Sequence, residues 1–393
     1  MPGRRIVWLL LAVTLLKLVL ASVWGWTADI YQTSLQASAF LAGHDLFDPQ
    51  NTGGGPAFFP LGHYLIAAAC LMTSHFTGIP FSFLLKTPAI VADLGVALLL
   101  RTTLRGGERA AIAYMLNPVT FLLSVYHGQL HTVAMAAAVL AFWLLERNRF
   151  KLGALALGLA GSVRQHYAVL IVLFLKRSKV QRPMVLAVFG ITFLLLNLSL
   201  LESHSPGRIF SPTWTYGSWG YTIPLVQGPR LLAMLGLNSV SAITDPINQF
   251  LQHYGASFYW LWALAFGLWT WRVKSQDPWK SSLLFLVGLY AISPGFGIQW
   301  LVWVVPFWLI VNRRQAFLYS ILAGLFIAGS YWQAGLNGLY GVRSVTANLR
   351  LLHIGDLIGM FIVGFLGVLT WVYCVRVAWQ LARPEIINAT GQG

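Results

Sequence analysis

Long apolar stretches, separated by short basic clusters, run through the whole chain and restrict it to a membrane-spanning helical fold. Hydrophobic residues make up 57% of the 393 positions, and only 11 positions are Asp or Glu. A stretch such as 6–24 is long enough to cross about 30 Å of hydrocarbon as a helix. Because lipid satisfies no backbone hydrogen bond, each crossing stretch has to be helical. We therefore predict an all-α polytopic membrane protein.

The basic residues indicate which ends of these stretches face the cytoplasm. Arg4 and Arg5 precede the first stretch, and Lys17 interrupts it. A cleaved signal peptide is the competing interpretation, but no clear small-residue cleavage site follows, which favours an uncleaved first span. The net charge of +15 lies in clusters at the ends of apolar stretches, a pattern typical of cytoplasmic membrane loops and not of a nucleic-acid-binding surface.

Placing the basic clusters on the cytoplasmic side predicts about twelve transmembrane helices with both termini cytoplasmic. Segment 60–76 is apolar enough to cross, but a crossing there would put the next clusters on the wrong side. We interpret it as a juxtamembrane or re-entrant helix within an outer loop at 25–81. The predicted spans are 6–24, 82–104, 109–126, 131–146, 152–163, 165–175, 183–201, 256–272, 280–292, 298–311, 316–332 and 355–376.

Two short stretches, 152–163 and 165–175, leave alternatives open. Either they form two oblique broken helices that expose Arg164, Gln165 and His166 on the outer side, or they make one span with these residues in its middle. Charge balance favours the first alternative. The chain then divides into a transmembrane module of seven spans at 1–201, an outer cap loop at 202–255 and a C-terminal transmembrane module at 256–393.

The outer side of this topology gathers polar residues around Asp29. A carboxylate in a loop is more often solvated than catalytic, but this one follows the first span closely in a chain with very few acids. Arg164 near membrane depth needs a partner, and a lipid phosphate would serve. Asp93, within the second span, is better explained as a structural residue paired with a polar neighbour. The other outer candidates are Tyr31, His127, Gln129, His131, Gln165, His166, Gln299, Trp300, Arg343 and Arg350.

This set of side chains suits transfer of a group from a lipid phosphate. A carboxylate at the water boundary can take a proton from an acceptor hydroxyl. Arg, Lys and His can hold a phosphate leaving group, with Arg giving bidentate geometry. Aromatic and amide side chains can hold a sugar. No Gly-rich nucleotide loop follows a predicted strand, so nothing supports a nucleotide-sugar donor.

Several segments together resemble the GT-C glycosyltransferases that use polyprenyl-phosphate sugars as donors. They follow the family's order over residues 25–310, and seven spans before a large outer loop are similar to that family's shared module. The matching pieces are Asp29-Ile-Tyr31, Ala42-Gly43-His44-Asp45-Leu46-Phe47-Asp48-Pro49, Phe59-Pro60-Leu61, Lys86-Thr-Pro-Ala-Ile-Val-Ala-Asp93-Leu-Gly95, Asn117-Pro118, His127-Gly128-Gln129, Ser162-Val-Arg164-Gln165-His166 and Ser293-Pro294 leading to Gln299-Trp300-Leu-Val-Trp303-Val-Val-Pro306.

The resemblance implies an outward-facing site, an inverting single displacement and a catalytic acid in the first outer loop, which by position is Asp29. It also implies that Lys86, Arg164 and His166 lie near the donor phosphate. His131 stands where the family commonly has an acid after Gly-Gln, and a paired acid beside the first-loop Asp is missing. Both departures argue against a metal. We assign Arg343 and Arg350 to the phosphate as well, and the substrates to Tyr31, His127, Gln129, His131, Gln165, Gln299 and Trp300.

We therefore expect a membrane glycosyltransferase that moves a hexose, mannose or glucose, from a polyprenyl-phosphate sugar to a lipid-linked or glycan acceptor on the outer face. It would need no cofactor, and its partners would be membrane lipids, the donor and the acceptor, with no nucleic acid. A lipid-linked glycan ligase or polymerase is the alternative, which would need outer Arg and His but no carboxylate base. A lipid or solute transporter ranks last, because the polar residues gather on one side and no two halves match.

Overall fold

The computed structural model describes residues 2–25, 27–46, 48, 50–53, 59–197, 219–228, 241–273, 277–294, 297–339 and 349–390. The described residues form α-, 3-10 and π-helices, with no strand among them. Five of these helices are long and apolar enough to cross a membrane, or six if the bent pair Glu108–Met115 and Pro118–His127 is one span. The all-α prediction is confirmed, and the apolar helices are compatible with a multi-pass membrane protein. Twelve crossings and the sidedness of the termini stay predictions.

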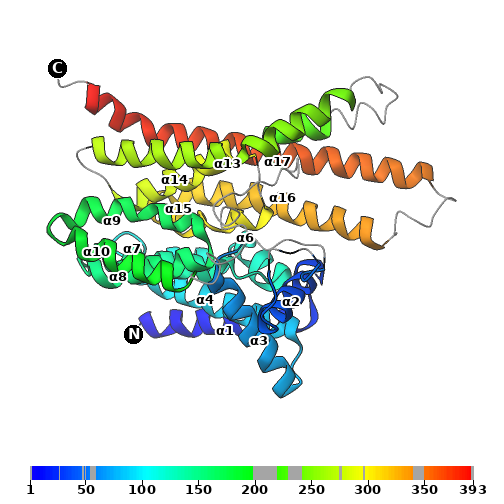
Figure 1. Cartoon of the computed structure of the whole chain (residues 1–393), viewed down its shortest axis with the longest axis horizontal. Helices are drawn as coiled ribbons and strands as arrows, with labels where there is room; N and C mark the ends of the chain where they lie inside the picture. The colour runs from blue at the N-terminus through cyan, green and yellow to red at the C-terminus, as the bar shows by residue number, and fades with distance from the viewer. Residues whose placement is uncertain are drawn as a thin grey trace. The chain divides into compact units, whose positions relative to one another are not determined.

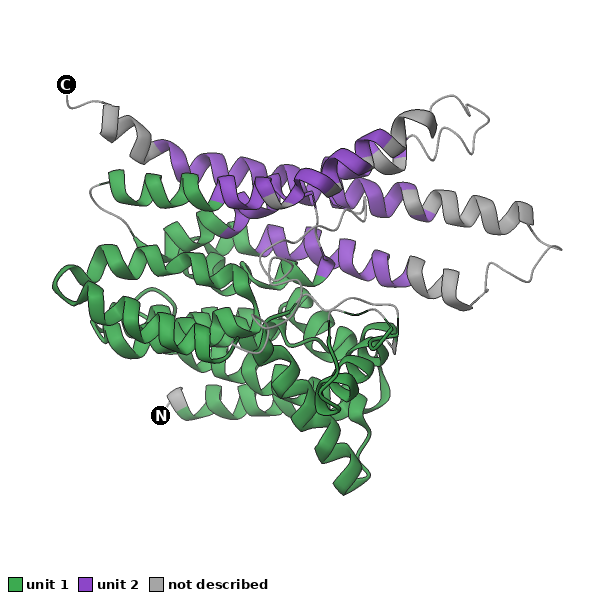
Figure 2. Cartoon of the chain, in the orientation of Figure 1, with its two compact units in different colours: residues 1–211, 263–285, 299–316 green, residues 212–262, 286–298, 317–393 purple. Residues whose placement is uncertain are grey.

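The chain divides into two compact units, coloured separately in Figure 2. Both units are assembled from segments that are not consecutive in the sequence. Unit 1 comprises 1–211, 263–285 and 299–316, and unit 2 comprises 212–262, 286–298 and 317–393. Most of the predicted cap loop at 202–255 lies outside the described residues.

The helices are labelled along the chain in Figure 1. Unit 1 contains α1 (Pro2–Val23), α2 (Thr27–Leu41), α3 (Leu61–Thr77), α4 (Phe81–Thr102), α5 (Glu108–Met115), α6 (Pro118–Phe121), η1 (Leu122–His127), α7 (His131–Glu146), α8 (Phe150–Val163), η2 (Gln165–Leu170), α9 (Ile171–Ser178), η3 (Lys179–Gln181), α10 (Arg182–Leu195) and α15 (Val305–Val311). Unit 2 contains η5 (Ile223–Gln227) and α17 (Leu349–Thr390). Four elements contribute residues to both units, namely α13 (Ser241–Arg272), α14 (Pro278–Ile292), η7 (Ile298–Val302) and α16 (Arg313–Leu339).

The segment predicted to be a juxtamembrane helix is α3. It begins after Pro60, whose ring presets the backbone at a helix start, and it packs against α2, α4 and α8. A Cβ on Gly62 would lie 2.6 Å from the carbonyl oxygen of Ser162, so only glycine lets α3 approach the end of α8 this closely. This approach brings the next residue, His63, to the end of α8.

Two helix breaks in unit 1 shape the surroundings of the candidate site. The first follows Asn117, whose side chain accepts a hydrogen bond from the backbone N–H of Val119 at 2.9 Å and so caps α6. The helix axis bends by 47° at this break. The second break is at Arg164, which leaves α8 in extended conformation, with φ −144° and ψ 106°.

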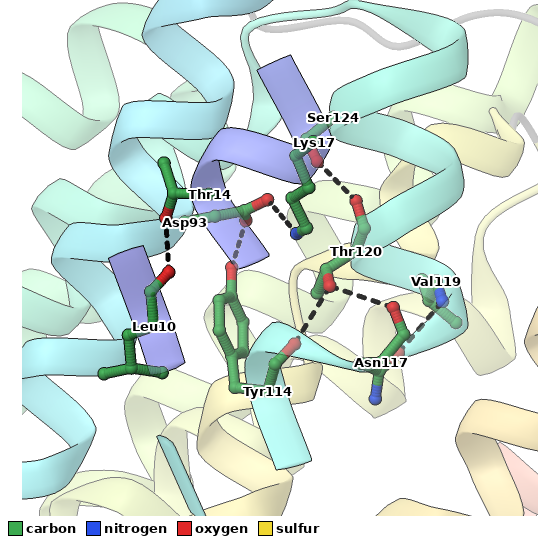
Figure 3. Close-up of polar contacts among 9 residues, drawn as sticks. All are labelled: Leu10, Thr14, Lys17, Asp93, Tyr114, Asn117, Val119, Thr120 and Ser124. Carbon is green, nitrogen blue, oxygen red and sulfur yellow. Dashed lines mark hydrogen bonds and ion pairs between the residues drawn. The ribbon is translucent and has the colours of Figure 1, made fainter. Parts of the chain in front are cut away.

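A buried ion pair joins α1 to α4 inside unit 1 (Figure 3). Nζ of Lys17 lies 2.6 Å from Oδ2 of Asp93, and both side chains are 0% exposed. Tyr114 donates its hydroxyl to Oδ1 of Asp93 at 2.7 Å. Both carboxylate oxygens are therefore satisfied, as a buried charge requires. The structure confirms the expectation that Asp93 is paired with polar neighbours.

Candidate functional site

The candidate site is built around the tight turn that joins η1 to α7. The π-helical η1 ends at His127, and Gly128 follows with a φ of 76°, in the left-handed region that favours glycine. The helix α7 then begins at His131. Both histidines are buried, and the turn places them at its two ends.

Asp29, in the first turn of α2, faces the first of these histidines. Its Oδ2 lies 3.4 Å from Nε2 of His127. The Asp29 side chain is 40% exposed, whereas that of His127 is 2% exposed. The structure thus brings two predicted site residues together and leaves the carboxylate accessible to a hydroxyl group from outside.

Arg164 approaches the second histidine from the break between α8 and η2. It is 1% exposed, and its Nε lies 3.1 Å from Nδ1 and 3.3 Å from Nε2 of His131. Its Nη1 donates to the carbonyl oxygen of Val163 at 2.7 Å and lies 3.1 Å from Nδ1 of His63. The guanidinium also lies over the ring of Phe59, 3.9 Å from the centroid. Among the described residues, no Asp or Glu pairs with this buried cation.

The polar junction of α8 and η2 is buried within the protein. The chain breaks at Arg164 between these two helices, and Arg164, Gln165 and His166 are only 1%, 6% and 3% exposed. The physical reason is that α3 and the segment carrying Trp303 cover this junction. The local sequence does not predict that either segment packs over this junction. Both membrane arrangements considered in the sequence analysis stay predictions.

The hydrogen bonds of His131 determine its tautomer. The indole N–H of Trp303, which can only donate, lies 2.9 Å from Nδ1 of His131. Nδ1 must therefore accept, and it accepts from Arg164 too. Nε2 then carries the proton and donates to Oε1 of Gln129 at 2.8 Å. His131 is a neutral acceptor whose ring is held in place from three sides.

His63 is also a neutral acceptor. Burial, and then the positive charge of Arg164, holds the pKa of His63 well below its usual value. Because Nδ1 accepts from Arg164, the proton of the neutral ring is on Nε2. Nε2 of His63 and Nη2 of Arg164 are both buried N–H donors with no hydrogen-bond partner in the described part of the chain. Two unmatched donors and one uncompensated positive charge are what an anionic oxygen would satisfy.

An aromatic wall stands on the side of His166. The rings of Trp300 and Trp303 stack at 4.9 Å with an interplanar angle of 14°. The His166 ring lies 4.8 Å from the first and 4.9 Å from the second. Gln299, the residue before Trp300, is half-buried in the same short helix. Of these predicted residues, the structure joins His166 and Trp300 directly.

Lys86 and Tyr31 lie apart from the Arg164 contacts. Nζ of Lys86 donates to the backbone carbonyl oxygens of Ala21 at 3.0 Å and Trp24 at 2.7 Å, at the C-terminal end of α1. A lysine there satisfies carbonyl groups that the helix itself cannot. Tyr31 is 66% exposed on α2. Arg343 and the side chain of Arg350 lie outside the described residues.

Three residues that contact Arg164 or its partners were not assigned to the site from the sequence, namely Phe59, His63 and Trp303. Phe59 and Trp303 lie in segments that resemble the family, but no role was given to either. A histidine in the first turn of an otherwise apolar helix was the available signal for His63. Trp303 follows Trp300 by three residues, which puts both on one face of a 3-10 helix. No sequence signal ties either residue to Arg164.

Within the described ranges, no group of three or more His, Cys, Asp or Glu is placed to hold a metal ion. No protein-family model, curated protein or solved structure matches this chain.

Proposed function

We propose that this protein is a membrane glycosyltransferase that moves a hexose, mannose or glucose, from a polyprenyl-phosphate sugar to a lipid-linked or glycan acceptor on the outer face. The reaction would be a single inverting displacement that needs no metal. The observation that carries the proposal is the buried guanidinium of Arg164, which pairs with no Asp or Glu among the described residues. Its N–H donor without a hydrogen-bond partner in that part of the chain suits a phosphate oxygen. A half-exposed carboxylate, Asp29, lies at the other end of the same histidine turn.

In the proposed reaction, the acceptor hydroxyl oxygen attacks the anomeric carbon of the donor sugar. The bond from that carbon to the phosphate oxygen breaks, and the polyprenyl phosphate leaves with the bonding electron pair. Asp29 takes the hydroxyl proton as general base. Arg164 and His63 stabilise the charge that develops on the departing phosphate. His131 acts through Arg164 as a positioning residue, and the Trp300 ring offers a flat apolar face for a sugar.

A direct test is transfer from radiolabelled polyprenyl-phosphate mannose and glucose by the purified protein in liposomes that contain a membrane lipid extract. Asp29→Asn should lower kcat by about 10²–10⁴, the usual loss for a general base, while donor binding persists. Asp45→Asn is the matched control, because Asp45 is an exposed acid shortly after the end of α2. If Asp29→Asn kept more than about a tenth of the wild-type kcat, the base would lie elsewhere.

A lipid-linked glycan ligase or polymerase is the second candidate. It is favoured by the hydrogen bonds that hold Arg164, none of which involves Asp29. A phosphate or diphosphate leaving group could be held there without a nearby base. Activity that survives Asp29→Asn but disappears in Arg164→Ala would select this candidate over the first.

A further inference from the structure

A pocket lies between α3 and α4 in unit 1. It has a volume of about 450 Å³, within the range of small-molecule sites. Its α3 wall includes Leu65, Ile66 and Cys70, and its α4 wall includes Leu84 and Pro88. None of the described residues that line it is assigned to the transfer reaction. The pocket therefore needs an explanation of its own.

Pro88 leaves one backbone carbonyl of the pocket wall without its helical partner. It stands inside α4, and because proline has no backbone N–H, the carbonyl oxygen of Leu84 receives no hydrogen bond from the residue four positions on. The thiol of Cys70, on α3, donates to this oxygen at 3.4 Å. A thiol is a weak donor and a carbonyl oxygen has two lone pairs, so this oxygen can still accept from a stronger donor.

The threonine hydroxyls of the pocket are acceptors as well. Thr73 donates to the carbonyl oxygen of Ala69 at 2.8 Å, and Thr87 donates to that of Phe83 at 2.9 Å. Each thus uses its only hydrogen within its own helix, and its oxygen remains able to accept. No charged residue lines the pocket in the described part of the chain. A phosphate, carboxylate or ester group, which can only accept, finds no free donor in this lining, whereas a hydroxyl group finds several acceptors.

The pocket lies near one end of a candidate membrane span. Leu84 and Pro88 are in the first two turns of the span Phe81–Thr102. At 1.5 Å per residue they lie about 5 and 10 Å along the helix from its start. In a bilayer crossed by α4, this depth is just inside the hydrocarbon, where water is scarce and a carbonyl without a donor is costly.

We propose that this pocket binds a neutral lipid that carries a free hydroxyl group, of the diacylglycerol type. The lipid hydroxyl donates to the carbonyl oxygen of Leu84, beside the thiol of Cys70. The apolar chains lie against Leu65 and Ile66 and continue into the bilayer. This site is additional to the proposed transfer reaction and does not depend on it.

The test measures lipid binding by the purified full-length protein in detergent, from the rise of its melting temperature with lipid concentration. The main probe is dioctanoylglycerol. Propylene glycol dioctanoate has the same chains and lacks only the hydroxyl group, and farnesyl phosphate represents an isoprenoid phosphate. We expect the wild type to bind dioctanoylglycerol about three- to tenfold more tightly than the analogue without the hydroxyl, the usual worth of one neutral hydrogen bond.

Two variants separate the carbonyl from the space around it. Pro88→Ala gives residue 88 an N–H that bonds to the Leu84 carbonyl within the helix, so the preference for the hydroxyl lipid should disappear. Pro80→Ala is the matched control, because Pro80 caps the start of the same helix and is not among the residues that line the pocket. Ala69→Leu fills the pocket from an exposed position on α3, and it should weaken binding of both dioctanoyl lipids at least about tenfold.

Each result either supports the site or overturns it. Equal binding of the two dioctanoyl lipids by the wild type would overturn the hydroxyl contact, and a preference that survives Pro88→Ala would show that the Leu84 carbonyl is not the acceptor. Normal binding by Ala69→Leu would place the lipid elsewhere. Farnesyl phosphate bound as tightly as dioctanoylglycerol would assign the pocket to an isoprenoid phosphate, and no binding of any probe would also overturn the proposal. Because no transfer is measured, these results are independent of whether the protein is a glycosyltransferase.

Discussion

Three buried cations occur among the described residues of unit 1, and two of them, Lys17 and Arg164, have opposite surroundings. Lys17 is 0% exposed and lies 2.6 Å from Asp93, whose other oxygen accepts from Tyr114. Arg164 is 1% exposed, and its hydrogen-bond partners among the described residues are neutral, the rings of His63 and His131 and one backbone carbonyl. Within the described part of the chain, the first charge is compensated by an acid and the second is not.

This difference in partners distinguishes Lys17, a structural residue, from Arg164, which we propose binds a ligand. A paired buried ion leaves little charge for anything else, so the lysine pair ties α1 to α4 and does no more. A guanidinium held by neutral acceptors keeps its full charge while its position is restrained. That arrangement costs stability unless an anion completes it, which is common at sites where function and stability compete.

The largest expected effect is on protein stability and comes from breaking the buried ion pair of Lys17 and Asp93. Asp93→Asn leaves Lys17 buried without a counter-charge and should lower the free energy of unfolding by about 3–5 kcal/mol. The double variant Lys17→Met/Asp93→Leu should recover most of this loss, because it removes both charges at similar volume. Reversible unfolding in mixed detergent measures both. If Asp93→Asn were as stable as the wild type, the stability of the protein would not depend on the pairing of Lys17 with Asp93.

Substitution of Arg164 should weaken donor binding more than it lowers the stability of the protein. Arg164→Ala should raise the apparent KM for the donor by at least about tenfold, since a hydrogen bond to a charged group is worth roughly 1.5–3 kcal/mol. Arg164→Lys should restore only part, because the two-pronged geometry is lost. Arg147→Ala is the control, an arginine beyond the other end of α7. Unchanged donor kinetics in a folded Arg164→Ala protein would give Arg164 a structural role.

A third variant would give Arg164 an acidic partner within the protein. His63→Glu places a carboxylate within reach of Nη1 of Arg164, so the melting temperature should be kept or raised while donor affinity falls several-fold. His63→Gln retains a neutral acceptor and should preserve donor affinity better. If the glutamate variant bound the donor normally, the charge of Arg164 would not be what the donor needs.

His63 also predicts a pH dependence of stability. Its pKa is held well below the usual value by burial and then by Arg164. Between the two pKa values the unfolded chain binds a proton that the folded protein does not, so stability should fall as pH drops below about 6.5. Melting temperatures of the wild type and His63→Gln across this range should differ in slope. Equal slopes would show that His63 is not the titrating group.

The smallest perturbation is single-cysteine labelling, which tests on which side of the membrane the candidate site around Arg164 lies. Single cysteines at Gln50, before α3, and at Thr77, the last residue of α3, are both at exposed positions and should react equally with an impermeant reagent applied from outside. The background would lack Cys70 and Cys374. Opposite accessibility would mean that α3 crosses the membrane, and the outer location proposed for Asp29 would be lost.

The sequence by itself determined the all-helical, membrane-compatible character of the protein. Apolar stretches of span length allow no other backbone arrangement in lipid, and their described parts are largely helical. Stretches 109–126 and 298–311 are each broken into more than one helix. It also predicted a partner for Asp93 and a helix break at Arg164, because a buried charge and a polar turn have local physical requirements. The sequence placed Asp29 and His127 on the same predicted outer face, but it did not predict that the two side chains approach each other.

Only the tertiary structure decided which side chains meet. Arg164 contacts His63 from 101 positions away, and Trp303 reaches His131 across 172 positions. These meetings depend on how closely helices approach and how they are rotated, as at Gly62, where a single added carbon would push α3 from α8. Hydrophobic periodicity indicates that a face is buried but not what covers it. The pairing of one buried cation with an acid, and of the other with neutral imidazoles, is therefore a property of packing.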